Sequence, residues 1–209
     1  MNILVTGCNG QLGNEMQLLE KHHPEHNYFN TDVNELDITD EQAIQAFVEA
    51  NAIDGIVNCA AYTAVDRAET DQQLATKLNA EAPAYLAQAI EQRKGWFIQI
   101  STDYVFDGHS LQPYTEDQET NPQTVYGKTK LVGEFNALKL CSHTVIIRTA
   151  WLYSPYGRVT TAEYPTPAKR PAYSVLCKTK IQQTYHLNIP QWQDSLHTVV
   201  KQIQQEQQA

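Results

Sequence analysis

The chain has 209 residues, a length that fits one domain of ordinary size with at most a small appendage. Its 15 lysines and arginines face 24 aspartates and glutamates. The resulting formal net charge of −9 argues against a protein that coats nucleic acid, because phosphate binding needs a basic surface. Hydrophobic residues make up 42% of the chain and charged residues 19%, which excludes the composition of a disordered protein.

The sequence shows no targeting or metal-binding pattern. Its N-terminal residues have no basic flank, and no apolar run reaches the ~18 residues of a membrane helix, so we expect a cytoplasmic protein without a membrane span. The histidine-rich stretch 22–26 contains Pro24, which breaks the helical spacing of metal ligands, and we predict no metal site. Four cysteines lie far apart without a CxxC pair and are interpreted as reduced core residues: Cys8, Cys59, Cys141 and Cys177.

Apolar runs and amphipathic stretches alternate along the first 150 residues. The predicted strands lie at 2–6, 28–32, 55–61, 96–101 and 144–150. The predicted helices lie at 11–21, 40–50, 72–93 and 123–140, the second of them with Asp40 as its N-cap. Regular strand–helix alternation indicates βαβ units, and therefore an α/β fold of the Rossmann type with a doubly wound parallel sheet.

The alternation stops after Trp151. Prolines at positions 155, 165, 167 and 171 predict extended or looped chain over 154–175. A short helix at 178–185 and a final helix at 191–207 are expected beyond it.

A glycine-rich turn, GCNGQLG at 7–13, separates the first predicted strand from the first predicted helix. Glycines there let backbone N–H groups approach a pyrophosphate, and the positive end of the helix stabilises its charge. Asp32 ends the second strand 19 residues beyond Gly13, where a carboxylate can bind a ribose hydroxyl. The position favours a bound nicotinamide dinucleotide over an ordinary turn. Asp32 slightly favours NADH over NADPH, with a solvated loop acid as the alternative.

Tyr126 and Lys130 are four residues apart in the predicted helix 123–140, so both project from one face. An ammonium beside a phenol is expected to lower the phenol's pKa from its usual value of about 10. The pair can then supply a proton to a carbonyl oxygen while hydride reaches the carbon. A YxxxK pattern is common by chance. It gains weight from the glycine turn and from Thr102, whose hydroxyl at a strand end can bind the substrate oxygen.

Several segments together resemble the extended short-chain dehydrogenase/reductases, and within them the dTDP-4-dehydrorhamnose reductase family. They are GCNGQLG at 7–13, NCAAYTAVDRAE at 58–69, STDYVFDG at 101–108, PQTVYGKTKLVGE at 122–134, RTAWLY at 148–153, EYPTPAKRPAYSVL at 163–176 and IPQW at 189–192. The resemblance implies reduction of the 4-keto group of a dTDP-deoxyhexulose by NADPH or NADH, the last step to dTDP-L-rhamnose.

The resemblance also implies roles for individual residues. Cofactor contacts are expected at Gly7, Gly10, Gln11, Leu12, Gly13, Asp32, Asp37, Ile38, Ala61, Tyr62 and Thr63. Thr102, Tyr126 and Lys130 become the catalytic residues, and the last two also contact the cofactor. Thr102, Asp103 and Trp151 become substrate-binding residues, with core packing as the alternative for Trp151 and Ile38. Tyr104 follows Asp103 where related dehydratases carry an acid, which favours reduction over elimination of water.

The chain departs from the family pattern near residue 157, where a block of several tens of residues between RTAWLY and the C-terminal portion is absent. We expect a dinucleotide-binding domain at 1–153 and a reduced substrate-binding remnant at 154–209, with uncovered apolar surface at one sheet edge. A dinucleotide-binding protein without turnover is the alternative function, and a sugar-nucleotide epimerase or dehydratase is a third. The expected partner is a dTDP-sugar, with a homodimer as an option. Some family members have Mg²⁺-linked contacts, which this sequence does not support.

Overall fold

A computed structural model describes residues 1–155, 168 and 170–206 of the chain. The predicted break near residue 157 and part of the predicted loop 154–175 lie outside these residues.

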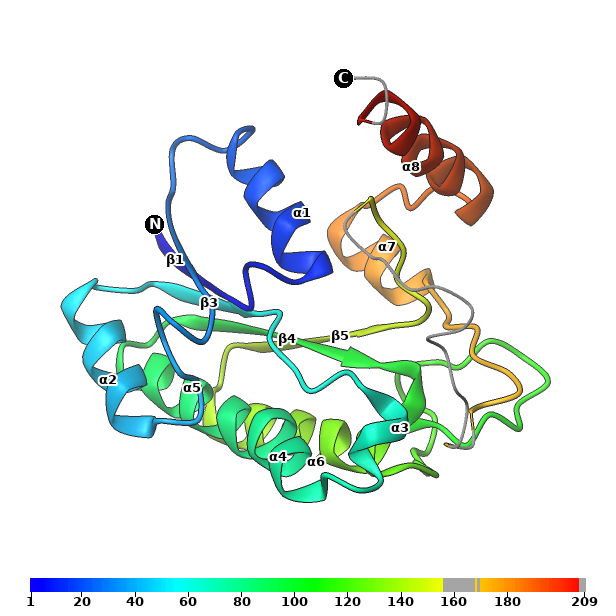
Figure 1. Ribbon diagram of the computed structural model, residues 1–209, viewed down its shortest axis with the longest axis horizontal. Helices are drawn as coiled ribbons and strands as arrows, with labels where there is room; N and C mark the ends of the chain where they lie inside the picture. The colour runs from blue at the N-terminus through cyan, green and yellow to red at the C-terminus, as the bar shows by residue number, and fades with distance from the viewer. Residues whose placement is uncertain (156–167, 169, 207–209) are drawn as a thin grey trace.

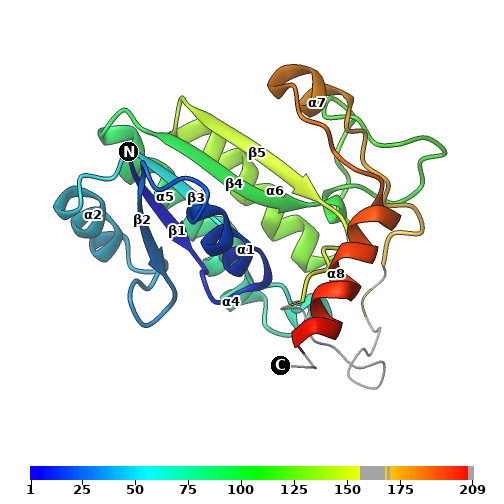
Figure 2. The same cartoon turned by 90° about the horizontal axis from the view of Figure 1, so that it is seen from above.

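The predicted parallel sheet is present. Its strands are β1 (Asn2–Thr6), β2 (Asn27–Thr31), β3 (Gly55–Asn58), β4 (Trp96–Thr102) and β5 (Thr144–Thr149). All neighbours pair in parallel, in the order β2-β1-β3-β4-β5 (Figures 1 and 2). The order reverses at β1, whose neighbours β2 and β3 extend the sheet in opposite directions. Ligands of such sheets bind beyond the carboxyl ends of the strands at this point. The predicted α/β fold of the Rossmann type is confirmed.

One face of the sheet carries the larger core. It is covered by α2 (Glu41–Ala50), α4 (Gln72–Thr76), α5 (Ala82–Gln92) and α6 (Val125–Leu140), with the short α3 (Val65–Ala68) near one end (Figure 1). Ile44, Ile56, Leu86 and Phe97 are completely buried between these helices and the sheet. Asp40 caps α2 as predicted, because its carboxylate accepts a hydrogen bond from the Ala43 N–H at 3.0 Å.

The predicted helix 72–93 is a helical run with a wider turn inside it. A π-helical turn, η1 (Lys77–Glu81), joins α4 to α5, and Pro83 occupies the first turn of α5. Proline has no N–H for the regular helical ladder, and a π turn is one way to accommodate the missing bond.

The opposite face of the sheet is thinly covered. α1 (Gln11–Glu20) packs there with Gly13 as its only fully buried residue, over a small cluster of Ile3, Val5 and Val57. Every residue of β5 is only partly buried, and no strand among the described residues pairs with its outer edge. Within the part of the chain that the structure describes, β5 is therefore an open edge of the sheet.

The C-terminal portion packs against the loop that follows β4. Residues Tyr114 and Leu176 form a parallel bridge, and the Tyr173 N–H donates to the Gly108 carbonyl oxygen at 3.1 Å. Two predicted helices follow, α7 (Thr179–Tyr185) and α8 (Trp192–Glu206), on the side of the sheet that carries α1 (Figure 1). No helix within the described residues has the length and apolarity to cross a membrane.

Candidate active site

A cleft of about 620 Å³ runs along the carboxyl ends of the strands. Its volume lies within the range of about 300–1,000 Å³ that is typical of small-molecule sites. The loops after all five strands contribute to it, together with α6. Most of the residues predicted for the site line this cleft: Gly7, Gly10, Gln11, Leu12, Asp32, Asp37, Ile38, Ala61, Thr63, Thr102, Asp103, Tyr126, Lys130 and Trp151. Gly13 and Tyr62 are the predicted residues that do not.

Each glycine of the turn has a different structural role. Gly7 has a φ of +66°, and a Cβ there would lie 2.7 Å from the Ala60 backbone, so the residue allows both the turn and the close approach of the loop after β3. A Cβ on Gly13 would lie 2.6 Å from Cys8 Cα, so this glycine lets α1 pack on β1. Gly10 is exposed at the cleft, and a Cβ there would meet only the Gly7 carbonyl oxygen within 4 Å, at 3.2 Å.

The N-terminus of α1 faces the cleft, and no side chain among the described residues caps it. Gly10 is its N-cap and offers no side chain, and the first turn holds no acidic residue. The backbone N–H groups of Gln11 and Leu12 are therefore available to an anion. The Gln11 side chain has another role: with its amide oxygen turned toward the segment that follows β5, it accepts hydrogen bonds from the Tyr153 and Ser154 N–H groups at 3.1 and 2.8 Å.

The second strand is predicted to end at Asp32, whereas β2 ends at Thr31 and Asp32 directly follows it, with its carboxylate held in place. One oxygen accepts from the Asn9 N–H at 3.2 Å and the other from the Val33 N–H at 2.8 Å. The nearby Val33 and Leu36 also line the cleft, beside Asp37 and Ile38. This arrangement forms an acidic and apolar end of the cleft, suited to a ribose and a planar base.

Tyr62 turns away from the cleft. Its N–H donates to Asn79 Oδ1 at 2.9 Å, and its phenol donates to Asp71 at 3.3 Å. The buried Asn79 also donates to Thr129 on α6 at 3.2 Å. Asn79 therefore fixes the loop after β3 against α6. Sequence analysis did not single it out, and its position within a predicted amphipathic helix gave no signal.

Tyr126 lies beside Thr102, with its ring edge-on to the ring of Tyr104 at a centroid distance of 5.4 Å. Burial raises the pKa of Tyr126 to about 12, a hydrogen bond with the Thr102 side chain lowers it, and the negative charges of Asp103 and Tyr104 raise it. The expectation that Lys130 brings this pKa below its usual value is wrong. Tyr126 is a protonated phenol at neutral pH.

Lys130 is fully buried in the cleft wall. Its Nζ donates to the Ile100 carbonyl oxygen at 2.6 Å. Burial lowers the pKa of Lys130 to about 8, although the charges of Glu134 and Cys59 act in the opposite direction. The amine therefore remains mostly protonated at neutral pH, in a place where it can bind a hydroxyl group in the cleft.

The end of β4 carries two buried polar atoms without a partner among the described residues, Ser101 Oγ and Asp103 Oδ2. Both residues line the cleft on either side of Thr102. Burial raises the pKa of Asp103 to about 6, against the hydrogen bond from Thr102 Oγ1 at 3.0 Å.

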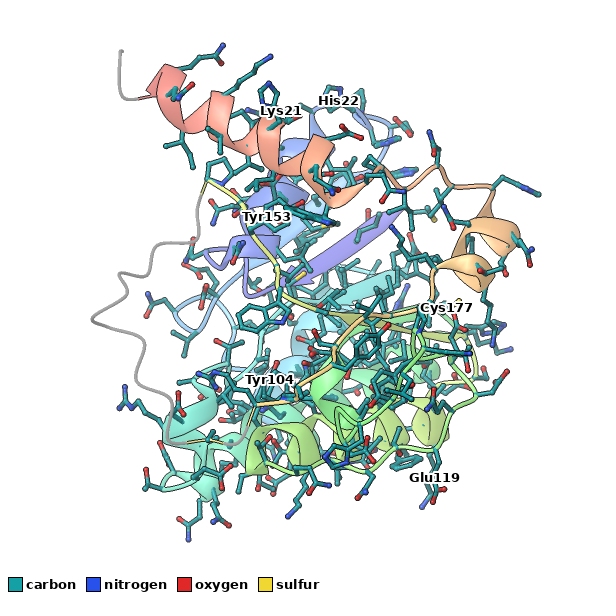
Figure 3. All side chains as sticks on the ribbon, turned by 90° about the vertical axis from the view of Figure 1, so that its right-hand side faces the viewer. Lys21, His22, Tyr104, Glu119, Tyr153 and Cys177 are labelled. Atoms are coloured by element: carbon teal, nitrogen blue, oxygen red, sulfur yellow. The ribbon has the colours of Figure 1, made fainter. Side chains whose placement is uncertain are left out.

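The segment after β5 forms a more open wall. Trp151 adopts a positive φ of 51°, is 62% exposed, and donates its indole N–H to Ser174 Oγ at 3.2 Å. Core packing is therefore excluded for Trp151. Tyr153 donates its hydroxyl to the Trp192 carbonyl oxygen at 2.8 Å, which ties this wall to α8. Figure 3 shows Tyr153 near α8 and Tyr104 farther down, near α6.

Comparison with known proteins gives the family. The profile of the family described as RmlD substrate binding domain matches residues 1–160 and, separately, 158–205. The two matches meet where the sequence departs from the family pattern. A dTDP-4-dehydrorhamnose reductase of Streptomyces griseus is 44% identical over 156 residues, which are 74% of this chain and 51% of that protein. The chain spans about half the length of the first curated relatives that it matches.

Solved structures agree with this result. The crystal structure of a dTDP-4-dehydrorhamnose reductase from Clostridium acetobutylicum matches with a TM-score of 0.90 and 32% identity, covering 98% of this chain and 100% of that one. The enzyme of the same name from Bacillus anthracis, in complex with NADP, matches with a TM-score of 0.72 and 37% identity, over 75% of this chain and 56% of that one. The chain therefore belongs to the dTDP-4-dehydrorhamnose reductase family.

Proposed function

We propose that this chain binds a reduced nicotinamide dinucleotide and reduces the 4-keto group of dTDP-4-dehydro-L-rhamnose to give dTDP-L-rhamnose. The observation that carries the proposal is the placement of Thr102, Tyr126 and Lys130 in one cleft with the glycine turn. Relatives named dTDP-4-dehydrorhamnose reductase support the substrate, and the Bacillus anthracis relative binds NADP.

The residues at the β1 end of the cleft fit the dinucleotide. Its pyrophosphate would bind the free N–H groups of Gln11 and Leu12, in the space that the missing side chain of Gly10 leaves open. Asp32 would accept hydrogen bonds from the adenosine ribose, which favours NADH because a carboxylate repels a 2′-phosphate. Both NADH and NADPH remain candidates, since the Bacillus anthracis relative binds NADP.

At the other end of the cleft, the residues serve proton transfer. The bound cofactor supplies the hydride that reaches the carbonyl carbon. Tyr126 donates its proton to the carbonyl oxygen, and its raised pKa keeps the phenol protonated until the oxygen gains charge. Thr102 positions that oxygen, while the buried Lys130 orients the nicotinamide ribose and lends a positive charge.

The test is the oxidation of NADH and of NADPH by the chain in the presence of dTDP-4-dehydro-L-rhamnose, followed by dihydronicotinamide absorbance. We expect substrate-dependent turnover that falls by about 10²-fold or more in Tyr126→Phe, as for loss of a general acid. Tyr185→Phe, an exposed tyrosine of α7, is the matched control. Near-normal turnover in Tyr126→Phe would show that Tyr126 is not the acid.

A dinucleotide-binding protein without turnover is the second candidate. It is favoured by the exposure of the wall after β5 and by the family profile matching in two pieces. Separate titrations with NADH and with dTDP distinguish the two. Binding of NADH without dTDP supports the second candidate, and binding of both supports the reductase.

We further propose a cytoplasmic location and a homodimer. An apolar row on α6, with Val132, Phe135 and Leu138 each about half exposed, supports self-association. Sedimentation of the chain against Phe135→Glu tests the dimer, because a charge in this row would dissociate it.

A further inference from the structure

A row of polar side chains lies buried under the cleft, on the three neighbouring strands β1, β3 and β4 (Figure 2). Thr6, Asn58 and Gln99 are paired in register, so their side chains point to the same face of the sheet, and each is at most 1% exposed. The preceding row on this face is apolar and completely buried, and it consists of Leu4, Ile56 and Phe97. A polar row in such a place is costly unless its groups are hydrogen-bonded.

The hydrogen bonds of the polar row run in one direction. The Thr6 hydroxyl donates to Asn58 Oδ1 at 2.6 Å, and Asn58 Nδ2 donates to Gln99 Oε1 at 2.7 Å. Gln99 Nε2 in turn donates to the Ile100 carbonyl oxygen at 2.8 Å. This last acceptor also binds Lys130 Nζ, at 2.6 Å. The polar row therefore ends at the atom that anchors the buried amine.

The shared carbonyl oxygen gives Gln99 a means of acting on Lys130. A lysine side chain is long and flexible, so the place of its ammonium group depends on the acceptor that binds it. The Ile100 carbonyl oxygen can bind Lys130 only while its peptide group keeps one orientation, and the Gln99 amide holds it there. Asn58 holds that amide in turn, because only one of the two amide orientations places Oε1 toward Asn58 Nδ2.

We propose that Gln99 is a positioning residue of the site, and that it holds the ammonium group of Lys130 in place through the Ile100 carbonyl oxygen. The inference rests on the proposed function, in which Lys130 orients the nicotinamide ribose. Gln99 does not line the cleft, whereas the residue after each member of the polar row does: Gly7 after Thr6, Cys59 after Asn58 and Ile100 after Gln99. Gln99 therefore acts on Lys130 from beneath the cleft, without contact to the cofactor.

The alternative is a purely structural polar row, which stabilises the sheet without affecting the site. Gln99→Met separates the two, because methionine keeps the length of the side chain and removes its amide. Phe97→Leu is the matched control, since Phe97 points to the same face of β4 two residues earlier and its substitution leaves a cavity in the core. Both variants should lower stability in urea unfolding, and only Gln99→Met should alter Lys130.

The first measurement needs neither cofactor nor substrate. In proton–nitrogen-15 spectra, the ammonium group of Lys130 is the signal that is absent in Lys130→Met. Its protons are buried and hydrogen-bonded, so we expect slow exchange with solvent in the wild type. Exchange should become at least about tenfold faster in Gln99→Met and stay within about twofold in Phe97→Leu. Equal exchange in wild type and Gln99→Met overturns the proposal.

The second measurement is a double-mutant cycle on the affinity for NADH. Lys130→Met should raise the NADH Kd by about tenfold or more, because a hydrogen bond from a charged group is lost. Gln99→Met should raise it by about threefold to tenfold, because the ammonium group is held less firmly. In the Lys130→Met chain, Gln99→Met should change the Kd by less than about twofold, since its target is gone. Two effects that multiply would show that Gln99 does not act through Lys130.

A second variant covers the case in which Gln99→Met does not fold, since that change leaves the Asn58 amide without its acceptor. Asn58→Leu combined with Gln99→Met extends the neighbouring apolar row, and replacing both partners of a buried hydrogen bond is tolerated better than replacing one. This chain should show the same faster exchange at Lys130 and the same cycle with Lys130→Met.

The outcomes separate the two hypotheses. A wild-type chain that binds no NADH, or that oxidises none with the keto sugar, refutes the proposed function, and the exchange of the Lys130 protons still decides the role of Gln99. A chain that turns over, but whose Lys130 protons exchange equally in wild type and Gln99→Met, refutes the role of Gln99 alone.

Discussion

Substitutions in the glycine turn can distinguish residues needed for folding from residues needed for cofactor binding. Gly10 and Gly13 are three residues apart, yet an added methyl group would meet different surroundings. At Gly13 the Cβ would lie 2.6 Å from Cys8 Cα, inside the packing of α1 on β1. At Gly10 the backbone is extended, with φ −76° and ψ 173°, and the Cβ would point to the cleft, 3.2 Å from the Gly7 carbonyl oxygen.

We therefore predict opposite results for the two alanine variants. Gly13→Ala should lower the free energy of unfolding by about 1–3 kcal/mol, because backbone atoms must move to admit the methyl group. Gly10→Ala should change it by less than about 1 kcal/mol, since alanine adopts this conformation without strain. Its methyl group would take up space in the cleft lining beside Gln11 and Leu12. Loss of one hydrogen bond to a charged group, worth about 1.5–3 kcal/mol, weakens dinucleotide binding by about 10- to 100-fold.

Urea unfolding gives the stabilities, and quenching of tryptophan fluorescence by NADH gives the dissociation constants. A Gly10→Ala chain that binds NADH as tightly as wild type would show that the pyrophosphate does not lie at the N-terminus of α1. A Gly13→Ala chain of unchanged stability would show that the close packing of α1 on β1 is not needed.

Three further variants test charged groups. Arg148→Met should lower stability by about 3 kcal/mol in urea unfolding, because Arg148 binds Glu134 through two hydrogen bonds of 2.9 and 2.6 Å and the buried carboxylate would lose both. If the double variant Arg148→Met, Glu134→Gln regains stability, the Glu134 carboxylate is the cause of the loss. Asp32→Ala should raise the ratio of the NADH Kd to the NADPH Kd by about tenfold, because NADH would lose a hydrogen bond and NADPH a repulsion. An unchanged ratio would show that the ribose lies elsewhere. Asp103→Asn should be more stable than wild type by about 1–3 kcal/mol at pH 7.5 and equal to it near pH 3. The raised pKa of about 6 stabilises the folded chain below pH 3.8, and this contribution is lost as the pH rises through 6. Equal stabilities at both pH values would contradict the raised pKa.

Most strands and helices of the sheet and its covering layers can be predicted from the local sequence, because buried parallel strands and amphipathic helices have different hydrophobic periods. The predicted third strand, however, reached residue 61, whereas β3 ends at Asn58. Beyond that point the chain belongs to the cleft, and the Tyr62 N–H binds a side chain on η1 instead of a neighbouring strand. This long-range contact has no local signature.

For the site, too, local spacing could be predicted from the sequence and long-range packing could not. Spacing on a helix predicts that Tyr126 and Lys130 share one face, since four residues make about one turn, and both line the cleft. It could not show that Lys130 is fully buried and bound to the Ile100 carbonyl oxygen, or that burial dominates the pKa of Tyr126. Desolvation depends on everything packed around a group, and a sequence spacing contains no such information.

The outer edge of β5, which is unpaired as far as the described residues show, affects how the chain behaves at high concentration. Backbone N–H and carbonyl groups along an open edge can pair with the same edge of another copy and extend the sheet between molecules. A net charge of −9 keeps copies of the chain apart at low ionic strength. At 0.1 M salt the Debye length is about 10 Å, so charges farther apart than this repel one another only weakly. Light scattering of concentrated solutions should therefore increase with added sodium chloride, and this protein is best stored at low ionic strength.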